Sequence, residues 1–431
     1  MNAKQLLHEV KQGALHDKMM EIYQTEAHTQ IQTARYEKAI KEFTHIFNHD
    51  TSDEAHIFSA PGRTEVCGNH TDHQHGEVLA ASISDDAIAV VTPRDDMAVQ
   101  LLSEGYDMMT IKLDSLEKNP DEEGTTKALI RGVLSGMKNR GYNIGGFNAY
   151  ITSDVLSGSG LSSSAAFETI IGNIVSGLYN DMKVDPVEIA IIGQYAENEY
   201  FGKPCGLMDQ MACSVGALCH IDFEDPDVPK VERIDFNLNS VGYSLCITDT
   251  KGSHADLTPD YAAVPDEMRQ VAKILGSDYL RHTDRNDIRK NLSLIREKAG
   301  DRALMRALHF YQENERVREA VTALKENRFE DFLYTINESG NSSFKYLQNV
   351  YSPQDLKHQN TSLGLMISDV VLKRSGEKSA HRIHGGGFAG TIQAFVKNDF
   401  VEYYRKSMDE LFGEGSCHVL LIRPYGGVMV I

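Results

Sequence analysis

Residues 145–181 read GGFNAYITSDVLSGSGLSSSAAFETIIGNIVSGLYND and carry the clearest local pattern of the chain. Phe147, Ala149 and Ile151 alternate with more polar neighbours, as in a strand with one buried face. After the Gly/Ser run, apolar residues recur every three or four positions, as on the buried side of a helix. The stretch therefore predicts a strand, a loop rich in glycine and serine, and a helix.

The sequence on both sides of this stretch also reads as a series of helices and strands. Residues 1–48 read as helices, short β-like runs follow from about residue 56 (HIFSAPG, VLAASIS, AIAVVTP, MAVQLLS and MMTIKL), and TKALIRGVLSGMKNRG reads as a helix. Asp185, Pro186 and Glu188 predict a capping box at the start of another helix, which runs to about Tyr200. Strands follow near 218–250, helices from about 260 to 375, and final strands after the glycines of HGGGFAGTIQAFV.

A chain of 431 residues is too long for one ordinary core, so two domains are expected. The pattern is that of an α+β protein without internal repeats, and it changes near residues 220–240. We predict an N-terminal helical extension (1–48), an N-terminal domain (49–225) and a C-terminal domain (226–431).

Charge and composition narrow the class of protein. The formal net charge of −19 argues against nucleic-acid or anionic-membrane partners, whose phosphates would be repelled. We see neither a signal-peptide pattern nor a run of about 18 apolar residues. The six cysteines form no CxxC pair, which is typical of reduced thiols. We therefore expect a cytoplasmic protein, as a monomer or weak homo-oligomer.

The loop SGSGLSSSAA (157–166) is a candidate phosphate site. Glycines let backbone N–H groups approach a ligand closely, and the positive end of the following helix favours an anion. Hydroxyls of the serines can add hydrogen bonds or bind Mg²⁺. The GK[ST] ending of a Walker A loop is absent. A flexible turn is the alternative, but the position between a strand and a helix favours a phosphate cradle.

Two further stretches carry groups suited to catalysis. Glu197 and Asp209 lie on either side of the PCGLM turn, and two such carboxylates can divide metal binding from proton acceptance. A surface Glu and a capping Asp are the plainer interpretation. Gly385, Gly386 and Gly387 precede a strand and indicate either a tight turn or a ligand contact.

The stretch GNHTDHQHG (68–76) holds three histidines and an aspartate within nine residues. By itself it is compatible with a metal site formed by His70, His73 and His75, with a solvated loop, or with a surface that binds a small polar molecule.

The motifs APGRTEVCGNHTD, GSGLSSSAA, GKPCGLMDQ and GGGFAGT, in this order, resemble the galactokinase branch of the GHMP kinases, which are named for galactokinase, homoserine kinase, mevalonate kinase and phosphomevalonate kinase. The similarity covers roughly residues 34–430 and includes TPRDDMAVQLLS. The resemblance implies a two-domain GHMP fold, with a ribosomal-protein-S5-like N-terminal domain, a ferredoxin-like C-terminal domain and the active site in the cleft between them. It implies ATP and Mg²⁺ as cofactors and a small sugar as the substrate.

The resemblance also implies roles for individual residues. Asp209 matches the residue that accepts the proton of the anomeric hydroxyl, and Arg63 the residue that keeps it ionised. Ser164 and Glu197 match the Mg²⁺ ligands, although the neighbouring Ser163 is an alternative. The residues that match the loop binding the ATP phosphates are Gly158, Ser159, Gly160, Leu161, Ser162, Ser163 and Ser164. Those that match the sugar site are Asn69, His70, Asp72, Gly206 and Tyr261.

Three departures from the usual galactokinase text, GEHTDYNGG, leave the sugar open. Asn69 replaces Glu, His73 replaces Tyr, and QHG replaces NGG, while DHQ resembles galacturonate kinases. Since asparagine is neutral and has a donor and an acceptor, Asn69 would tolerate a 6-hydroxyl or a 6-carboxylate. We expect galactose as the substrate, with galacturonate or another modified galactose as the second alternative. A regulator that binds sugar and ATP without catalysis is a third alternative, although Arg63 and the two carboxylates are present.

Overall fold

The computed structural model describes residues 1–47, 54–155, 160–252, 257–388 and 390–431. Its α-helices and β-strands are, in chain order, α1 (Ala3–Lys11), α2 (His16–Tyr23), α3 (Glu26–Phe47), β1 (His56–Cys67), β2 (Glu77–Arg94), β3 (Ala98–Ser103), β4 (Met109–Lys112), α4 (Thr126–Asn139), β5 (Gly146–Ser153), α5 (Ser163–Asn180), α6 (Pro186–Tyr195), α7 (Met208–Val215), β6 (Leu218–Asp222), β7 (Lys230–Ile234), β8 (Tyr243–Asp249), α8 (Thr258–Ile274), α9 (Arg285–Lys290), α10 (Leu292–Lys298), α11 (Gly300–Lys325), α12 (Phe329–Ser342), α13 (Asn360–Lys373), β9 (Ala380–Ile383), β10 (Thr391–Lys397), α14 (Val401–Phe412), β11 (Cys417–Leu420) and β12 (Val428–Met429).

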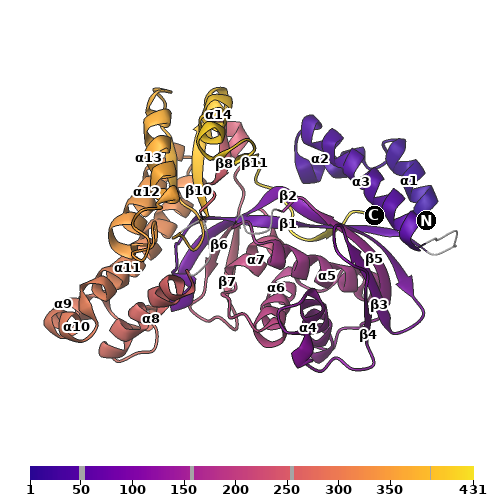
Figure 1. The fold of residues 1–431 in the computed structure, drawn as a ribbon, viewed down its shortest axis with the longest axis horizontal. Coiled ribbons are helices and arrows are strands. Elements are labelled where there is room, and N and C mark those ends of the chain that lie inside the picture. Colours follow the sequence, from indigo (N-terminus) through magenta and orange to yellow (C-terminus); the bar gives the residue numbers. More distant parts are fainter. Residues whose placement is uncertain (48–53, 156–159, 253–256, 389) are drawn as a thin grey trace.

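The larger sheet lies between two layers of helices. Its strands run in the order β12-β1-β2-β5-β3-β4, and β6 joins it by pairing with β2 and β7. Helices α1 to α3 cover one face and α4 to α7 the other (Figure 1). Because successive side chains of a strand point to opposite faces, Ile88 and Val90 pack beneath α1–α3, whereas Ala89 and Val91 pack against the second layer. Burial on both faces explains the nearly continuous apolar runs of β1 and β2.

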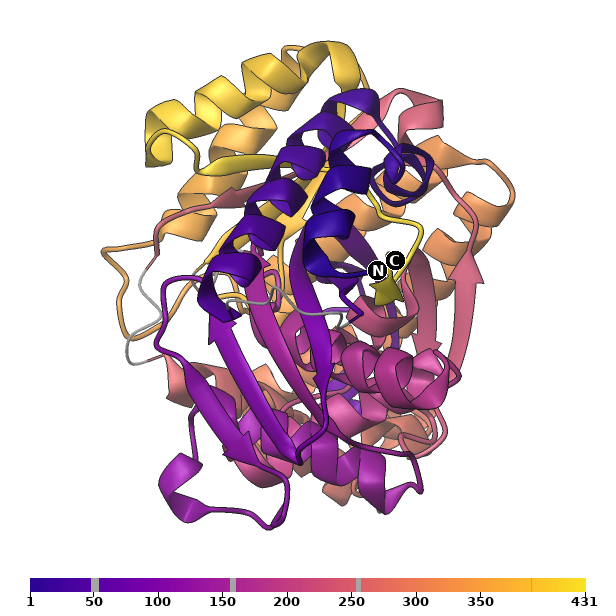
Figure 2. The ribbon, with the colours of Figure 1, turned by 90° about the vertical axis from the view of Figure 1, so that its right-hand side faces the viewer.

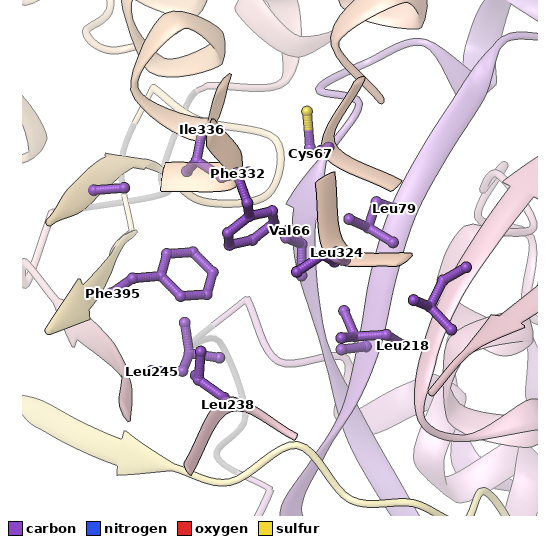
Figure 3. Close-up of a cluster of buried hydrophobic side chains, with 14 of the residues drawn as sticks. Val66, Cys67, Leu79, Leu218, Leu238, Leu245, Leu324, Phe332, Ile336 and Phe395 are labelled. Atoms are coloured by element: carbon purple, nitrogen blue, oxygen red, sulfur yellow. The ribbon is translucent and has the colours of Figure 1, made fainter. Parts of the chain in front are cut away.

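The smaller sheet has the order β11-β8-β10-β9 and is accompanied by the helices of the C-terminal half. A hydrophobic cluster joins the two sheets, with Val66 and Leu79 from the larger sheet, Leu245 and Phe395 from the smaller one, and Phe332 from α12 (Figure 3). This shared core holds the two halves together along one side of β1.

The two termini lie side by side at the edge of the larger sheet (Figure 2). The backbone N–H of Ile57 in β1 donates to the carbonyl of Ile431 at 3.0 Å, and β12 pairs with β1. Strand β12 therefore belongs to the larger sheet, as does β7 through its pairing with β6, although both strands lie beyond residue 225. The point in the sequence where strands of the larger sheet give way to strands of the smaller sheet does not coincide with the predicted boundary between residues 225 and 226. The division into domains stays a prediction.

Most of the predicted elements are confirmed, and two details are wrong. VLAASIS and AIAVVTP, read as separate runs, are parts of the single strand β2. Asp185 caps α6 as predicted and accepts from the N–H of Val187 at 2.8 Å. Glu188 does not complete the capping box, because its carboxylate pairs with Arg140 at 2.9 Å. Beyond Tyr195 the helix widens into a π-helix, Ala196–Phe201.

Strand β2 continues through a charged residue because that charge is neutralised. Asp86 has no exposed surface, and Arg35 of α3 and Arg423 near the C-terminus approach its carboxylate at 2.6 and 2.8 Å. Ser59 of β1 and Tyr23 of α2 donate hydroxyl hydrogens to the same carboxylate. Burial alone would raise the pKa of Asp86, but the two arginines and the hydroxyl donors hold it below its ordinary value.

In the described part of the chain, no helix combines the length and the apolar character that crossing a bilayer requires.

We predict that Asp86→Asn lowers the free energy of unfolding by about 3–5 kcal/mol at pH 7, because two arginines lose their buried counter-charge. Since the folded pKa is lowered, the contribution of Asp86 is present above its unfolded pKa of about 3.9 and is lost as pH falls through the folded value. Urea unfolding as a function of pH measures both effects, and the difference between parent and variant should shrink in acid.

Asp154→Asn is the matched control, since Asp154 also lies 3.0 Å from Arg35 but is 44% exposed. This substitution should lower the free energy of unfolding by less than about 1 kcal/mol. Equal losses in the two variants would contradict the role assigned to Asp86.

Candidate active site

A bidentate ion pair connects β1 to the start of α7. Arg63 donates from Nε to Oδ1 of Asp209 at 2.7 Å and from Nη2 to Oδ2 at 2.8 Å. Its third nitrogen donates to the carbonyl of Gly160, and Ser162 donates its hydroxyl hydrogen to Asp209. The pair therefore also ties the Gly/Ser loop to α7.

This environment keeps Asp209 ionised. Burial would raise the pKa of its carboxyl, but Arg63 and the hydroxyl of Ser162 hold it below the ordinary value. A partly exposed carboxylate that stays charged at neutral pH is suited to accept a proton from a hydroxyl group placed beside it.

The Gly/Ser loop leads into the N-terminus of α5. Gly158 and Ser159 lie outside the described residues, and Gly160 adopts a φ of 72°. Leu161 is buried, and its carbonyl accepts from the N–H of Arg63 at 3.0 Å. Ser162 holds the N-cap position with a left-handed φ of 59°, so Ser163 and Ser164 form the first turn. The free N–H groups of this turn are suited to bind a phosphate.

Ser164 and Glu197 lie together, as the resemblance implies for metal ligands. The hydroxyl of Ser164 is 3.4 Å from Oε1 of Glu197, which is buried in the π-helix. Lys203 donates to the same oxygen at 3.1 Å, and Gln210 donates to Oε2 at 2.9 Å. Hydroxyl and carboxylate oxygens fit Mg²⁺, which usually keeps several waters and substrate phosphates as its other ligands.

A second buried carboxylate, Glu168 of α5, adjoins this pair. The amide of Gln210 donates to Glu168 at 3.0 Å as well as to Glu197, and Oε1 of Glu168 has no hydrogen-bond partner among the described residues. Burial, and then the charge of Glu197, raise the pKa of Glu168. The sequence interpretation had not singled out Glu168, although it follows Ser164 by one helical turn.

A cavity of about 210 Å³ opens beside the Arg63–Asp209 pair. It is lined by Arg63, Glu65, Asn69, His70, Asp72, His73, Pro204, Cys205, Gly206, Met208, Asp209, Gly385 and Gly386. Of the predicted sugar-site residues, only Tyr261 is absent from this lining. Its ring lies behind the wall, where a Cβ on Gly386 would meet it at 2.5 Å, and its hydroxyl donates to the carbonyl of Gly387 at 2.7 Å.

His70 and Asp72 both line the cavity. Burial lowers the pKa of His70 to about 3, so the ring is neutral at pH 7. Its Nε2 lies 2.9 Å from the carbonyl of Gly386 and must donate, which leaves Nδ1 as an acceptor without a partner among the described residues. Asp72 lies against Gly206, where an added Cβ would be 2.3 Å from Oδ2. A side chain at position 206 would therefore displace the carboxylate of Asp72.

Asn69 also lines the cavity, but it has no exposed surface and its amide is engaged by the protein. Its Nδ2 donates to both carboxylate oxygens of Glu65, at 3.0 and 3.1 Å, and to the carbonyl of Gly385 at 2.6 Å. The sequence interpretation had assigned the reading of carbon 6 to Asn69. That role stays a prediction, and Glu65 is a cavity residue that the interpretation missed.

The three histidines of GNHTDHQHG are not clustered as metal ligands. His75 stacks on Tyr279 with ring centroids 3.7 Å apart, whereas His70 and His73 lie at the cavity. Within the described ranges, no group of three histidine, cysteine or acidic side chains is arranged to hold a metal ion.

Comparisons with known proteins show the family of this chain. The model of the GHMP kinases N terminal domain matches residues 128–217, and the galactokinase galactose-binding signature matches residues 41–93. The galactokinase of Lactobacillus helveticus is 30% identical over 383 residues, which cover 87% of this chain and 94% of the relative. That of Pyrococcus furiosus is 32% identical over 343 residues, 79% of this chain and 88% of the relative.

Solved structures show the same relationship. Lactococcus lactis galactokinase, complexed with galactose, superposes with a TM-score of 0.75 at 25% identity, over 90% of this chain and 98% of that one. Methanococcus jannaschii mevalonate kinase shares the fold, with a TM-score of 0.60 at 15% identity, over 87% of this chain and 99% of that one.

The fold and the site thus define a small-molecule kinase of the GHMP class, as the motifs predicted. Within that class, the chain belongs to the galactokinase family.

We predict that Arg63→Met moves the acid limb of the kcat/KM profile upward by about one to three pH units. Without the guanidinium, burial raises the pKa of Asp209 against only the hydroxyl of Ser162 and the charge of Lys203, so the carboxylate becomes protonated at higher pH. ADP release measured between pH 4 and 9 gives the profile. Arg131→Met, which removes a comparable bidentate pair with Glu122, is the control, and an acid limb shifted equally in both variants would contradict the assignment.

Proposed function

We propose that this protein transfers the γ-phosphoryl group of ATP to the anomeric hydroxyl of galactose, giving galactose 1-phosphate and ADP. The observation that carries the proposal is the Arg63–Asp209 pair, which lies in the cavity wall and is also bonded to the loop that starts α5. A sugar in the cavity and a nucleotide phosphate at the N-terminus of α5 would meet at this pair.

In this reaction the anomeric oxygen attacks the γ-phosphorus, the bond from that phosphorus to the β-γ bridging oxygen breaks, and the hydroxyl proton passes to Asp209. Arg63 holds the carboxylate in one orientation by two hydrogen bonds and offsets the charge that approaches with the phosphates. Phosphoryl transfer depends mainly on such positioning and on charge neutralisation.

Ser164 and Glu197 would hold Mg²⁺ next to the phosphates, where the ion would neutralise charge on the transferring group. Lys203 lies 3.1 Å from Glu197 and adds a second positive charge at this end of the site. The positive end of α5 and these groups supply what an acidic protein needs to bind ATP.

The cavity wall favours a neutral sugar over a uronate. Glu65, Asp72 and Asp209 line it, whereas Arg63 is already paired with Asp209. A substrate carboxylate in this cavity would be repelled by the carboxylates of the wall. Galactose is therefore preferred to galacturonate as the substrate.

We predict that Asp209→Asn lowers kcat by about 10²–10⁴-fold while ATP binding is kept, because the amide keeps the shape but cannot take a proton. A coupled ADP-release assay with galactose measures turnover, and calorimetry measures ATP binding. Asp96→Asn, which alters a similar pair with Arg94 on an exposed loop, should leave turnover unchanged.

Near-parental kcat in Asp209→Asn would refute the role of this aspartate. If the unsubstituted protein binds galactose and ATP but releases no ADP, it is a sugar-binding regulator, and the proposed function is wrong.

We predict that Ser164→Ala and Glu197→Gln each raise the Mg²⁺ concentration needed for half-maximal rate, because the first removes a hard oxygen ligand and the second removes the charge of one. Mg²⁺ titrations at saturating ATP measure this. Ser163→Ala is the matched control from the same turn. If the titration shifts for Ser163→Ala and not for Ser164→Ala, the ligand is Ser163.

A further inference from the structure

Glu65 is a carboxylate in the wall of the sugar cavity for which the proposed reaction has no role. It lies in β1, two residues after Arg63, and its residue surface is 3% exposed. The pairing of β1 with β2 is regular from Arg63 to Glu65, so both side chains leave the same face of the strand. Both line the same cavity.

The neighbouring Asn69 cannot offer its amide hydrogens to a ligand. Both are donated within the protein, to the carboxylate of Glu65 and to the carbonyl of Gly385. Its Oδ1 accepts from Asn349 at 2.7 Å. The side chain of Asn69 therefore serves to orient the Glu65 carboxylate.

The Glu65 carboxylate keeps capacity for one more donor. Oε1 accepts from Asn69 and from Arg382, each at 3.0 Å, whereas Oε2 accepts from Asn69 alone within the described chain. A carboxylate oxygen has two lone pairs, so Oε2 can accept another hydrogen bond. Burial raises the pKa of Glu65, and Arg382 acts against that rise.

We propose that Glu65 accepts a hydrogen bond from the hydroxyl on carbon 6 of the sugar, and that this contact selects galactose over sugars altered at that carbon. The inference rests on the proposed function, which puts the anomeric carbon at Asp209. Two positions along a strand span about 7 Å, comparable to the width of one hexose. With the anomeric end at the Arg63–Asp209 pair, Glu65 faces the far end of the sugar, where carbon 6 projects.

The test compares kcat/KM for galactose, 6-deoxygalactose and galacturonate. The unsubstituted protein should prefer galactose to 6-deoxygalactose by roughly 10- to 100-fold, as expected for a hydrogen bond to a charged acceptor. Glu65→Gln should reduce this ratio about tenfold. It should also raise kcat/KM for galacturonate relative to that for galactose, because the negative charge that repels the substrate carboxylate is gone. In the double variant Glu65→Gln with Asn69→Glu, the carboxylate is at position 69 and the amide at position 65, so the two partners of the hydrogen bond are exchanged. This variant should restore the preference for galactose.

Glu313→Gln is the matched control. Glu313 is also fully buried and accepts from the N–H of Gly68 at 3.1 Å, but it does not line the cavity. Its substitution should change kcat/KM for all three sugars by one common factor. Three results would overturn the inference. The ratios of kcat/KM between the sugars could stay parental in Glu65→Gln, or they could change equally in Glu313→Gln. The double variant could also show the same ratios as Glu65→Gln alone.

Calorimetric binding of galactose and 6-deoxygalactose, done in parallel, separates the two proposals. If the unsubstituted protein releases no ADP, the proposed reaction fails, and the binding ratios still test Glu65. If it turns over galactose and Glu65→Gln leaves both ratios as in the parent, only the assignment of Glu65 fails.

Discussion

The burial of Asp86 in the middle of β2 is the constraint on which the arrangement of the chain depends. An unpaired carboxylate in that position would be very costly, so positive charge has to reach it from elsewhere. Arg35 comes from the N-terminal helices and Arg423 from the C-terminal segment, and both contact Asp86 directly. The two ends of a chain of 431 residues are thereby fastened to one strand of the larger sheet.

The same cluster sets the position of the groups that we propose as catalytic. Ser59 of β1 bonds to Asp86, and the register places Pro61 opposite Asp86 before a bulge that ends at Arg63. From there the N–H of Arg63 donates to the carbonyl of Leu161, and its side chain meets Asp209. The registration of β1 on β2 thus aligns the Gly/Ser loop with α7, and a shift of one residue would turn Arg63 to the opposite face.

Local pattern and motif together were enough to predict the strand, loop and helix around residues 145–181, the capping Asp185 and the family. Contacts between distant segments could not be predicted in this way. Strand β2 was read as two runs because its polar centre looks like a break, and the arginine that neutralises Asp86 from the C-terminal side is 337 positions away. Asn69 stands in a motif that predicts a sugar contact, but nothing local reveals that its amide also bonds to Gly385 and Asn349, and its role in reading carbon 6 stays a prediction.

The distribution of charge over the site follows from these contacts and gives the proposed substrates their orientation. The sugar cavity is lined by carboxylates whose charges are offset from behind or beside, by Arg382 at Glu65 and by Arg63 at Asp209. The loop side instead presents the N-terminus of α5 and Lys203. Hydroxyl groups, which donate to carboxylates, are therefore favoured at one end, and phosphate oxygens, which need donors and positive charge, at the other. In the proposed function, a protein with a net charge of −19 binds a nucleotide through groups that attract phosphate and lie at the N-terminal end of α5.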